Sequence, residues 1–300
     1  MPKLTIFTAT YNRGHLIHRI YDSLNKQSKF DFEWLVIDDG STDNTSQIFE
    51  EYLKRESKYP IRYYAQSNQG LIRSLNRGIE LAKGKYFIKL DSDDYVTDYF
   101  IEKILSWLLE IKNESHIYGV GGLRVTKDGI PLKGIWPIIP KDGFVDITDL
   151  ERKKYELDAD MTEAWSLNIL RNYKFPVWED EKFAPEQIIF HDIALKGYKI
   201  RWRAIPLTIC EYQQEGLTLG ANSLEKNNPM GYAMMYNYML RRNDITRYRK
   251  FHAAANHIAL SIVGKNPQYI LKTNSIKYTF IGLIPGIMLS IRRYIQYRKR

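Results

Sequence analysis

Strand-like and helix-like stretches alternate along the first hundred residues. Short runs of β-branched and aromatic residues, typical of buried strands, occupy residues 4–9, 32–37, 61–64 and 86–90. Between them, apolar residues recur with helical spacing over residues 15–25, 46–55 and 71–82. Strands that are separated by helices of this kind predict right-handed βαβ units and a parallel sheet.

The pattern becomes less regular after residue 97. An amphipathic helix is predicted over residues 98–112, a strand over 117–124, and a Gly- and Pro-rich loop or hairpin over 127–143. From about Pro229 the chain becomes helical, aromatic and basic. We therefore expect an α/β fold with a mostly parallel sheet flanked by helices, followed by a helical C-terminal extension.

Composition and charge narrow the class of protein. The 300 residues are 44% hydrophobic and 26% charged, as in ordinary globular proteins. The single cysteine, Cys210, permits no internal disulfide and is expected to be a buried apolar residue. We expect no signal peptide, because residues 1–7 lack a long apolar run, and no spanning helix, because no stretch reaches about 18 uncharged apolar residues. The net charge of +9 predicts an anionic partner: a nucleotide, a nucleic acid or a membrane surface.

Polar residues follow three of the predicted strands. Asp91-Ser92-Asp93-Asp94 comes directly after the strand at 86–90, and similar polar runs occupy residues 8–12 and 38–39. Clustered carboxylates resist burial, but they suit a divalent metal ion and the phosphates that it carries. Ligands of parallel sheets bind beyond the carboxyl ends of the strands, so the three runs are expected to meet in one crevice.

These motifs resemble the family 2 glycosyltransferases of the GT-A fold. The matching stretches are residues 8–13, 36–43, 68–70 with Asn76, 82–86 and 91–94, of which the last corresponds to the DXD motif of the family. They cover about the first hundred residues and are specific as a set. The resemblance implies transfer of a sugar from a nucleotide-sugar donor to an acceptor hydroxyl.

The resemblance also assigns roles to residues. The nucleotide would be bound by Thr10, Tyr11, Arg13, Asp38, Asp39, Asn68, Gly70, Asp91 and Ser92. Asp39, or its neighbour Asp38, would accept a hydrogen bond from the base, for which N3–H of uracil is the usual donor. Asp93 together with Asp91 would hold Mn²⁺ or Mg²⁺, whereas Asp94 and Asp160 would lie near the sugar or acceptor. Taken alone, the 38–41 and 91–94 runs also suit a turn followed by a helix cap.

An inverting reaction needs a carboxylate that takes the proton of the acceptor hydroxyl. Glu186 follows Pro185 and precedes a predicted helix, whose N-terminus would favour the anionic form. Glu179 and Asp180 form the acidic pair that many family members place at a helix start. We favour Glu186 as the base, with Asp180 and Glu179 as the alternatives.

The C-terminal segment carries much of the basic excess. Residues 278–291 are apolar, interrupted by Pro285-Gly286, and residues 292–300 are rich in Arg and Lys. This pattern suits peripheral attachment to an anionic membrane, and the alternative is a set of core helices packed on the catalytic domain. We expect a cytoplasmic protein on the inner face of the cell membrane, with a glycan or lipid-linked acceptor of the kind used in bacterial surface-polysaccharide synthesis.

Together these observations predict a metal-dependent, inverting glycosyltransferase that uses a nucleotide sugar, in particular a UDP-sugar. Residues 1–225 would form the GT-A catalytic domain, with a nucleotide-binding half at 1–100 and an acceptor half at 101–225. Residues 226–300 would be the helical, basic C-terminal region. The sugar, the linkage and the oligomeric state stay open.

Two other functions remain as alternatives. A nucleotidyltransferase normally needs a Gly-rich phosphate loop after the first strand, but residues 10–14 contain one glycine. A non-catalytic nucleotide-sugar-binding protein would not need an intact Asp91-Ser92-Asp93. No nucleic-acid partner is expected, because the basic residues accompany an apolar segment rather than a dedicated domain.

Overall fold

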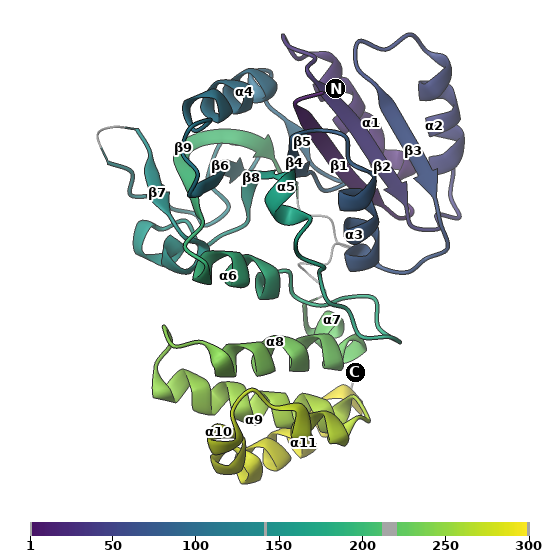
Figure 1. Ribbon diagram of the computed structural model, residues 1–300. Helices are drawn as coiled ribbons and strands as arrows, with labels where there is room; N and C mark the ends of the chain where they lie inside the picture. Colours follow the sequence, from purple (N-terminus) through teal and green to yellow (C-terminus); the bar gives the residue numbers. More distant parts are fainter. Residues whose placement is uncertain (1, 141–142, 212–220, 299–300) are drawn as a thin grey trace. The chain divides into compact units, whose positions relative to one another are not determined.

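The computed structural model describes residues 2–140, 143–211 and 221–298, with only the backbone at 221 and 222. Within these residues the chain forms a nine-stranded sheet with helices on its faces and a set of C-terminal helices (Figure 1). The predicted α/β class with a helical C-terminal extension is confirmed.

The first hundred residues form a parallel half-sheet. Its elements are β1 (Leu4–Thr10), α1 (Gly14–Asn25), β2 (Phe32–Asp38), α2 (Thr45–Lys54), β3 (Ile61–Ala65), α3 (Leu71–Leu81) and β4 (Tyr86–Lys89). The strands lie in the order β3-β2-β1-β4, and every neighbouring pair is parallel. Their carboxyl ends therefore share one edge of the sheet, as the alternating pattern predicts.

The following residues extend the same sheet with a mixed arrangement. The further elements are β5 (Tyr95–Val96), α4 (Phe100–Glu110), β6 (Ile117–Val125), β7 (Val145–Ile147), the 3₁₀ helix η1 (Asp149–Tyr155), β8 (Met161–Ser166), α5 (Leu167–Leu170), α6 (Gln187–Leu195) and β9 (Lys199–Ile209). Strand β8 runs antiparallel between β4 and β6, whereas β6 and β9 are parallel. Strands β5 and β7 pair antiparallel with β9. The antiparallel pairs are thus confined to the half of the sheet beyond β4.

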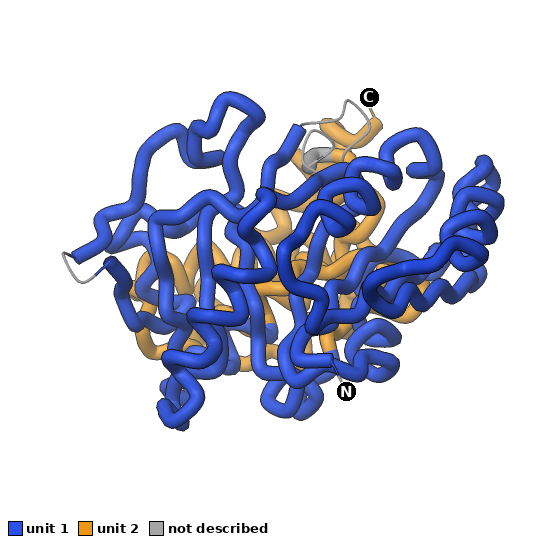
Figure 2. The backbone as a smooth tube through the Cα atoms, turned by 90° about the horizontal axis from the view of Figure 1, so that it is seen from above, with its two compact units in different colours: residues 1–174, 189–213 blue, residues 175–188, 214–300 orange. Residues whose placement is uncertain are grey.

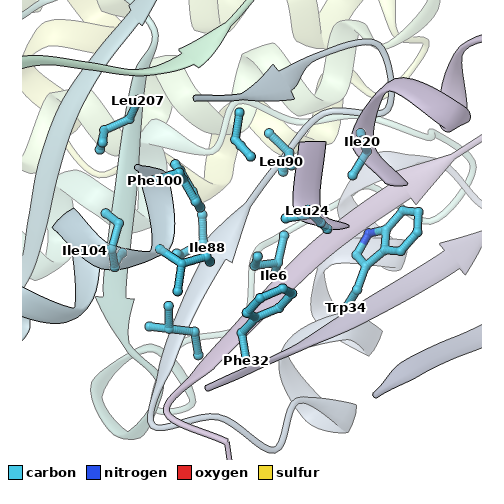
Figure 3. Close-up of a cluster of buried hydrophobic side chains, with 14 of the residues drawn as sticks. Ile6, Ile20, Leu24, Phe32, Trp34, Ile88, Leu90, Phe100, Ile104 and Leu207 are labelled. Carbon is cyan, nitrogen blue, oxygen red and sulfur yellow. The ribbon is translucent and has the colours of Figure 1, made fainter. Parts of the chain in front are cut away.

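The main hydrophobic core lies between the parallel strands and the helices α1 and α4 (Figure 3). Trp34, Ile6 and Ile88 contribute from three neighbouring strands, and Phe100 contributes from α4; all four are completely buried. Helices cover both faces of these strands, which is why the strands are nearly continuous apolar runs in the sequence. Each such side chain stabilises the fold by about 1.5–3 kcal/mol through burial.

The chain divides into two compact units (Figure 2). Residues 1–174 and 189–213 form the first unit, which contains the sheet. Residues 175–188 and 214–300 form the second. The predicted functional boundary at residues 225 and 226 stays a prediction.

The second unit is helical. It contains α7 (Ala221–Asn227), α8 (Pro229–Arg241), α9 (Arg247–Val263), the 3₁₀ helix η2 (Pro267–Lys272), α10 (Ile276–Ile281) and α11 (Leu283–Arg298). Helix α9 packs against α8 as well as against α10 and α11. Residues 175–188 are joined to these helices by the buried Glu181, whose carboxylate accepts hydrogen bonds at 2.7 Å from the N–H groups of Met230 and Gly231 at the start of α8. Among the described residues, no helix combines the length and the apolar character needed to cross a bilayer.

Candidate functional site

The three polar runs lie at the carboxyl ends of neighbouring strands. Thr10, at the end of β1, pairs in register with Asp38 at the end of β2. On the other side of β1, Leu90 N–H donates to the carbonyl of Phe7 at 2.9 Å, so that Asp91 begins where β4 leaves the sheet. The sheet therefore brings the three runs to one edge, as predicted from the order of the elements.

The loops after β1 and β2 are tied to each other by hydrogen bonds. The amide of Asn12 donates to Oγ of Ser41 at 2.9 Å, and the amide of Thr42 donates to Oδ1 of Asn12 at 2.8 Å. Further along, Gly14 N–H donates to Oδ2 of Asp43 at 3.0 Å. Asn12 has a positive φ of 52°, a conformation that asparagine tolerates better than most residues. We refer to residues 10–14 and 38–43, joined in this way, as the paired loops.

Asp39 fixes a third loop beside the first two. It is almost fully buried, and its carboxylate accepts hydrogen bonds from Nε2 of Gln66 at 2.7 Å, from the amide of Gln69 at 2.9 Å and from the amide of Gly70 at 2.7 Å. Gly70 has a φ of 94°, which favours glycine, and it directly precedes α3. A carboxylate offers about four acceptor positions, so Asp39 retains capacity for one further donor.

Asp38 has a different set of partners. Its Oδ1 accepts from the amide of Ser41 at 2.8 Å, and its Oδ2 accepts from the hydroxyl of Tyr63 at 2.5 Å. Burial, together with this bond to Asp38, raises the pKa of the Tyr63 hydroxyl. Asp38 thus shapes the turn after β2, while Asp39 joins that turn to residues 66–70.

Residues of the loop after β1 present groups that suit a nucleoside. The ring of Tyr11 is 48% exposed although it lies at the end of a buried strand. The Oγ1 atom of Thr10 is buried and has no hydrogen-bond partner among the described residues. Burial raises the pKa of Asp93, and the charge of Arg13 opposes that rise, as expected for a loop after β1 that lies near the acidic run.

The acidic run after β4 is organised around Arg124. This arginine is buried within β6, and its Nη1 atom lies 2.6 Å from Oδ2 of Asp91 and 3.0 Å from Oδ2 of Asp94. Its Nε–H donates to the carbonyl of Met161 at 3.2 Å. Asp91 also lies 3.8 Å from Nζ of Lys89. The structure therefore pairs the two outer carboxylates of the run with cations.

The three carboxylates differ in acidity for identifiable reasons. Loss of hydration raises the pKa of Asp91, but the charges of Lys89 and Arg124 outweigh it and lower that pKa to about 2. Burial raises the pKa of Asp94 to about 7, against the opposing effect of Arg124. Burial and the charge of Asp91 also raise the pKa of Asp93. Among the described residues, the ion pairs of the run are made by Asp91 and Asp94 and not by Asp93, so further positive charge beside Asp93 would stabilise its anionic form.

This donor set fits a hard divalent cation. Asp93 would be the principal ligand, with Asp91 beside it, because Mg²⁺ and Mn²⁺ take one or two carboxylates and complete their shell with water and phosphate oxygens. Among the described residues, no three His, Cys, Asp or Glu side chains are grouped as a metal centre made by protein alone. The site therefore suits a metal that arrives with a diphosphate.

The remaining predicted residues are placed as follows. Asn68 lies in the loop that Asp39 fixes, Ser92 lies in the turn of the acidic run, and Asp160 is exposed just before β8. Asp94, the last residue of the run, is buried, and the Cys210 thiol beside it contributes to lowering its pKa. Cys210 itself is buried, as predicted.

The candidate bases lie in residues 175–188, which belong to the second unit. Glu186 directly precedes α6 and is half-buried, whereas Glu179 and Asp180 lie in an exposed turn. Glu181, which the sequence did not single out, is occupied in capping α8. The choice of base stays a prediction.

Two residues of this site were missed from the sequence. Gln66 bonds to Asp39, and Arg124 holds Asp91 and Asp94. Gln66 carries no distinguishing pattern. Arg124 carries a recognisable signal, because it is a lone cation in a strand whose residues are all buried, and a buried charge requires a partner.

Known proteins resemble this chain in sequence and in fold. The sequence profile described as Glycosyl transferase family 2 matches residues 5–133. An uncharacterized glycosyltransferase of Haemophilus influenzae is 32% identical over 187 residues, which are 61% of this chain and 70% of the relative. The GalNAc(5)-diNAcBac-PP-undecaprenol beta-1,3-glucosyltransferase of Campylobacter jejuni is 26% identical over 235 residues, covering 77% and 72% of the two chains.

Coverage varies among the relatives and structures. In two Bacillus subtilis relatives, a putative and an uncharacterized glycosyltransferase, the match spans 30% and 36% of their length, about one third. The crystal structure of S. aureus TarS 1-349 in complex with UDP-GlcNAc superposes with a TM-score of 0.62 and 18% identity, over 99% of this chain and 92% of that one. That likeness shows a shared fold. The Haemophilus relative and the profile match over residues 5–133 show that this chain is a member of glycosyl transferase family 2.

Proposed function

We propose that this protein is a metal-dependent, inverting glycosyltransferase that moves a sugar from a UDP-sugar to an acceptor hydroxyl. The observation that carries the proposal is the acidic run, which leaves β4 at the same sheet edge as the paired loops. Carboxylates beside the paired loops at the carboxyl edge of the sheet suit a nucleoside diphosphate and its cation better than either feature alone.

The donor nucleotide would lie against the paired loops. The exposed ring of Tyr11 offers a stacking surface for the base, and Asp39 has one acceptor position left for N3–H of uracil. Thr10, Arg13 and Asp38, which also belong to the paired loops, would complete the binding site for the nucleoside. Asn68, Gly70, Asp91 and Ser92 would contact the ribose and diphosphate.

The reaction follows from the donor chemistry. The acceptor oxygen forms a bond to the anomeric carbon while the bond from that carbon to the diphosphate breaks, and the acceptor proton passes to a carboxylate. A cation held by Asp93 and Asp91, when bound, neutralises charge on the departing diphosphate. Asp94 and Asp160 are proposed on the sugar and acceptor side.

The acceptor and the location are proposed from relatives and charge. The Campylobacter relative carries an undecaprenol-linked acceptor in its name, so a glycan or lipid-linked acceptor is proposed here. Such an acceptor would place the enzyme in the cytoplasm, peripheral on the inner face of the cell membrane, next to anionic lipid. A basic chain of net charge +9 is suited to that surface.

The first test is a donor panel. UDP-, GDP- and dTDP-sugars are incubated with the protein in Mn²⁺ or Mg²⁺, with and without EDTA, and nucleotide release is measured. We expect release from a UDP-sugar that EDTA abolishes and excess Mn²⁺ restores, and calorimetry should show tighter UDP binding with Mn²⁺. Equal turnover in EDTA would contradict the metal role. Release of pyrophosphate from a nucleoside triphosphate would instead indicate a nucleotidyltransferase, and binding without turnover a non-catalytic protein.

A second prediction concerns the base. Replacing Glu186 with glutamine is expected to lower kcat by about 10²–10⁴-fold, the usual contribution of a general base, and to leave UDP affinity unchanged. Glu179→Gln, in the exposed turn of the same unit, tests the alternative assignment and should keep its activity if Glu186 is the base. Full activity in Glu186→Gln would move the assignment to Asp180 or Glu179.

A further inference from the structure

Helix α11 turns small and polar residues inward, whereas an ordinary amphipathic helix turns its large apolar residues inward. Its inner face is made of small and polar residues: a Cβ on Gly286 would lie 2.7 Å from Cβ of Ile258 in α9, and Ser290, one turn later, is buried. About one turn after Ser290, Arg293 pairs with Glu225 of α7 at 3.0 Å, and one turn later the hydroxyl of Tyr297 donates to the same carboxylate at 2.6 Å. The buried residues of α11 are therefore Gly286 and Ser290, and neither is a large apolar residue.

The large apolar side chains of α10 and α11 lie on the outer face. They form a line at helical spacing, which we call the outer ridge: Ile276 (82% exposed), Phe280 (81%), Ile284 (72%), Met288 (66%), Ile291 (57%) and Ile295 (49%). Among the described residues, more than half of the exposed large hydrophobic side chains lie between Leu271 and Ile295. A helix in contact with water normally turns such a stripe inward. A continuous exposed ridge of this kind marks an interaction surface.

The charge around the outer ridge indicates what covers it. Residues 245–300 contain eleven Lys and Arg and no Asp or Glu, a larger positive charge than the +9 of the whole chain. Lys277, Arg292 and Arg298 are exposed on the same two helices as the ridge. Long basic side chains beside an apolar ridge can keep their charge at phosphate level while their stems and the ridge enter the acyl boundary.

We propose that the outer ridge is the surface by which this protein lies in the interface of a bilayer that contains anionic lipid. The proposal rests on the proposed function, since it gives the enzyme access to a lipid-linked acceptor. A second copy of the chain is a poorer occupant, because two such surfaces would bring like charges together. The 16 residues of α11 suit a helix that lies along the interface, because its apolar ridge occupies one face only.

The test is vesicle flotation with the full-length protein. We expect binding to vesicles of phosphatidylglycerol and phosphatidylethanolamine, little binding to pure phosphatidylcholine, and release at 0.5 M salt. Ile284→Gln combined with Met288→Gln should weaken partitioning at least tenfold. The matched control is Leu53→Gln with Leu109→Gln, which changes two comparably exposed side chains on α2 and α4, 50% and 64% exposed, and should bind as the natural chain does.

A charge variant separates the two components of binding. The double variant Lys277→Gln/Arg292→Gln should have a smaller preference for phosphatidylglycerol, because it lacks two positive charges but keeps the side chains of the ridge. Because all of the substituted side chains are exposed, thermal unfolding should shift little and confirm that each variant folds.

Other outcomes would overturn the proposal. Equal vesicle binding by the Ile284/Met288 variant, or no binding by the natural chain, would exclude the ridge as a membrane surface. A dimer in light scattering that the same variant abolishes, without vesicle binding, would assign the ridge to a second copy. UDP release, measured in parallel without vesicles, reports on the proposed function. Vesicle binding without donor turnover would contradict the proposed function and would still support the ridge as a membrane surface.

Discussion

Replacing Arg124 with methionine is expected to lower the free energy of unfolding by about 3–5 kcal/mol, the usual effect of removing one partner of a buried ion pair. The guanidinium contacts Asp91 at 2.6 Å and Asp94 at 3.0 Å, and the Asp94 side chain is 7% exposed. Methionine fills a similar volume but leaves Asp94 buried without its cation. The loss should be measured by urea unfolding at pH 7.5 and above, because removal of Arg124 takes away the charge that holds the pKa of Asp94 down at about 7.

A control and a double variant make this test specific. Arg55→Met removes an exposed pair, 3.6 Å from Glu51, and should change stability by about 0.5 kcal/mol or less. Arg124→Met combined with Asp94→Asn should recover part of the lost stability, because the carboxylate left without a partner is removed as well. An Arg124→Met variant as stable as the natural protein would show that the acidic run does not depend on this arginine.

Replacing Asp39 with asparagine is expected to weaken UDP binding at least a hundredfold, about 3 kcal/mol at RT ln 10 of 1.4 kcal/mol per decade. The carboxylate of Asp39 accepts three hydrogen bonds from residues 66, 69 and 70. An amide presents one oxygen and two N–H donors, so at least one of these donors would face another donor. The loop at 66–70 would lose its anchor, and the uracil would lose its acceptor.

Calorimetric titration with UDP and Mn²⁺ measures this effect. Asp31→Asn is the control, since Asp31 accepts a hydrogen bond from the amide of Lys3 at 2.9 Å near the start of β1, the strand end opposite the paired loops. Its UDP affinity should equal that of the natural chain. Unchanged affinity in Asp39→Asn would exclude Asp39 from the nucleotide site and leave Asp38 as the candidate.

The parallel half of the sheet was predictable from the sequence within a residue or two at each end. Strand β2 is an apolar run because its residues are buried, and α1 begins at Gly14 where the helical spacing starts. Local pattern suffices there because each βαβ unit is built from neighbouring segments. The edge of the sheet on which the candidate site residues meet follows directly from that order.

Strand β9 shows why the second half was less predictable. It contains Arg201, Arg203 and Pro206, which dilute an apolar pattern. Arg201 is accommodated by Asp146 at 2.7 Å, and the Arg203 guanidinium lies over the ring of Trp107. These partners lie 55 and 96 positions away in sequence, so no local window contains the reason that the cations are tolerated. The same holds for Arg124 and its partners Asp91 and Asp94.

The paired loops have a consequence for selectivity. Their hydrogen bonds are made within the protein, so the loops take their shape during folding, and in the proposed nucleotide site little binding energy would be needed to order them when donor arrives. Each loop continues directly from a strand, so the register of β1 against β2 fixes where the two loops begin. We therefore expect that a substitution in the apolar core that displaces β1 against β2 would alter nucleotide selectivity as well as stability.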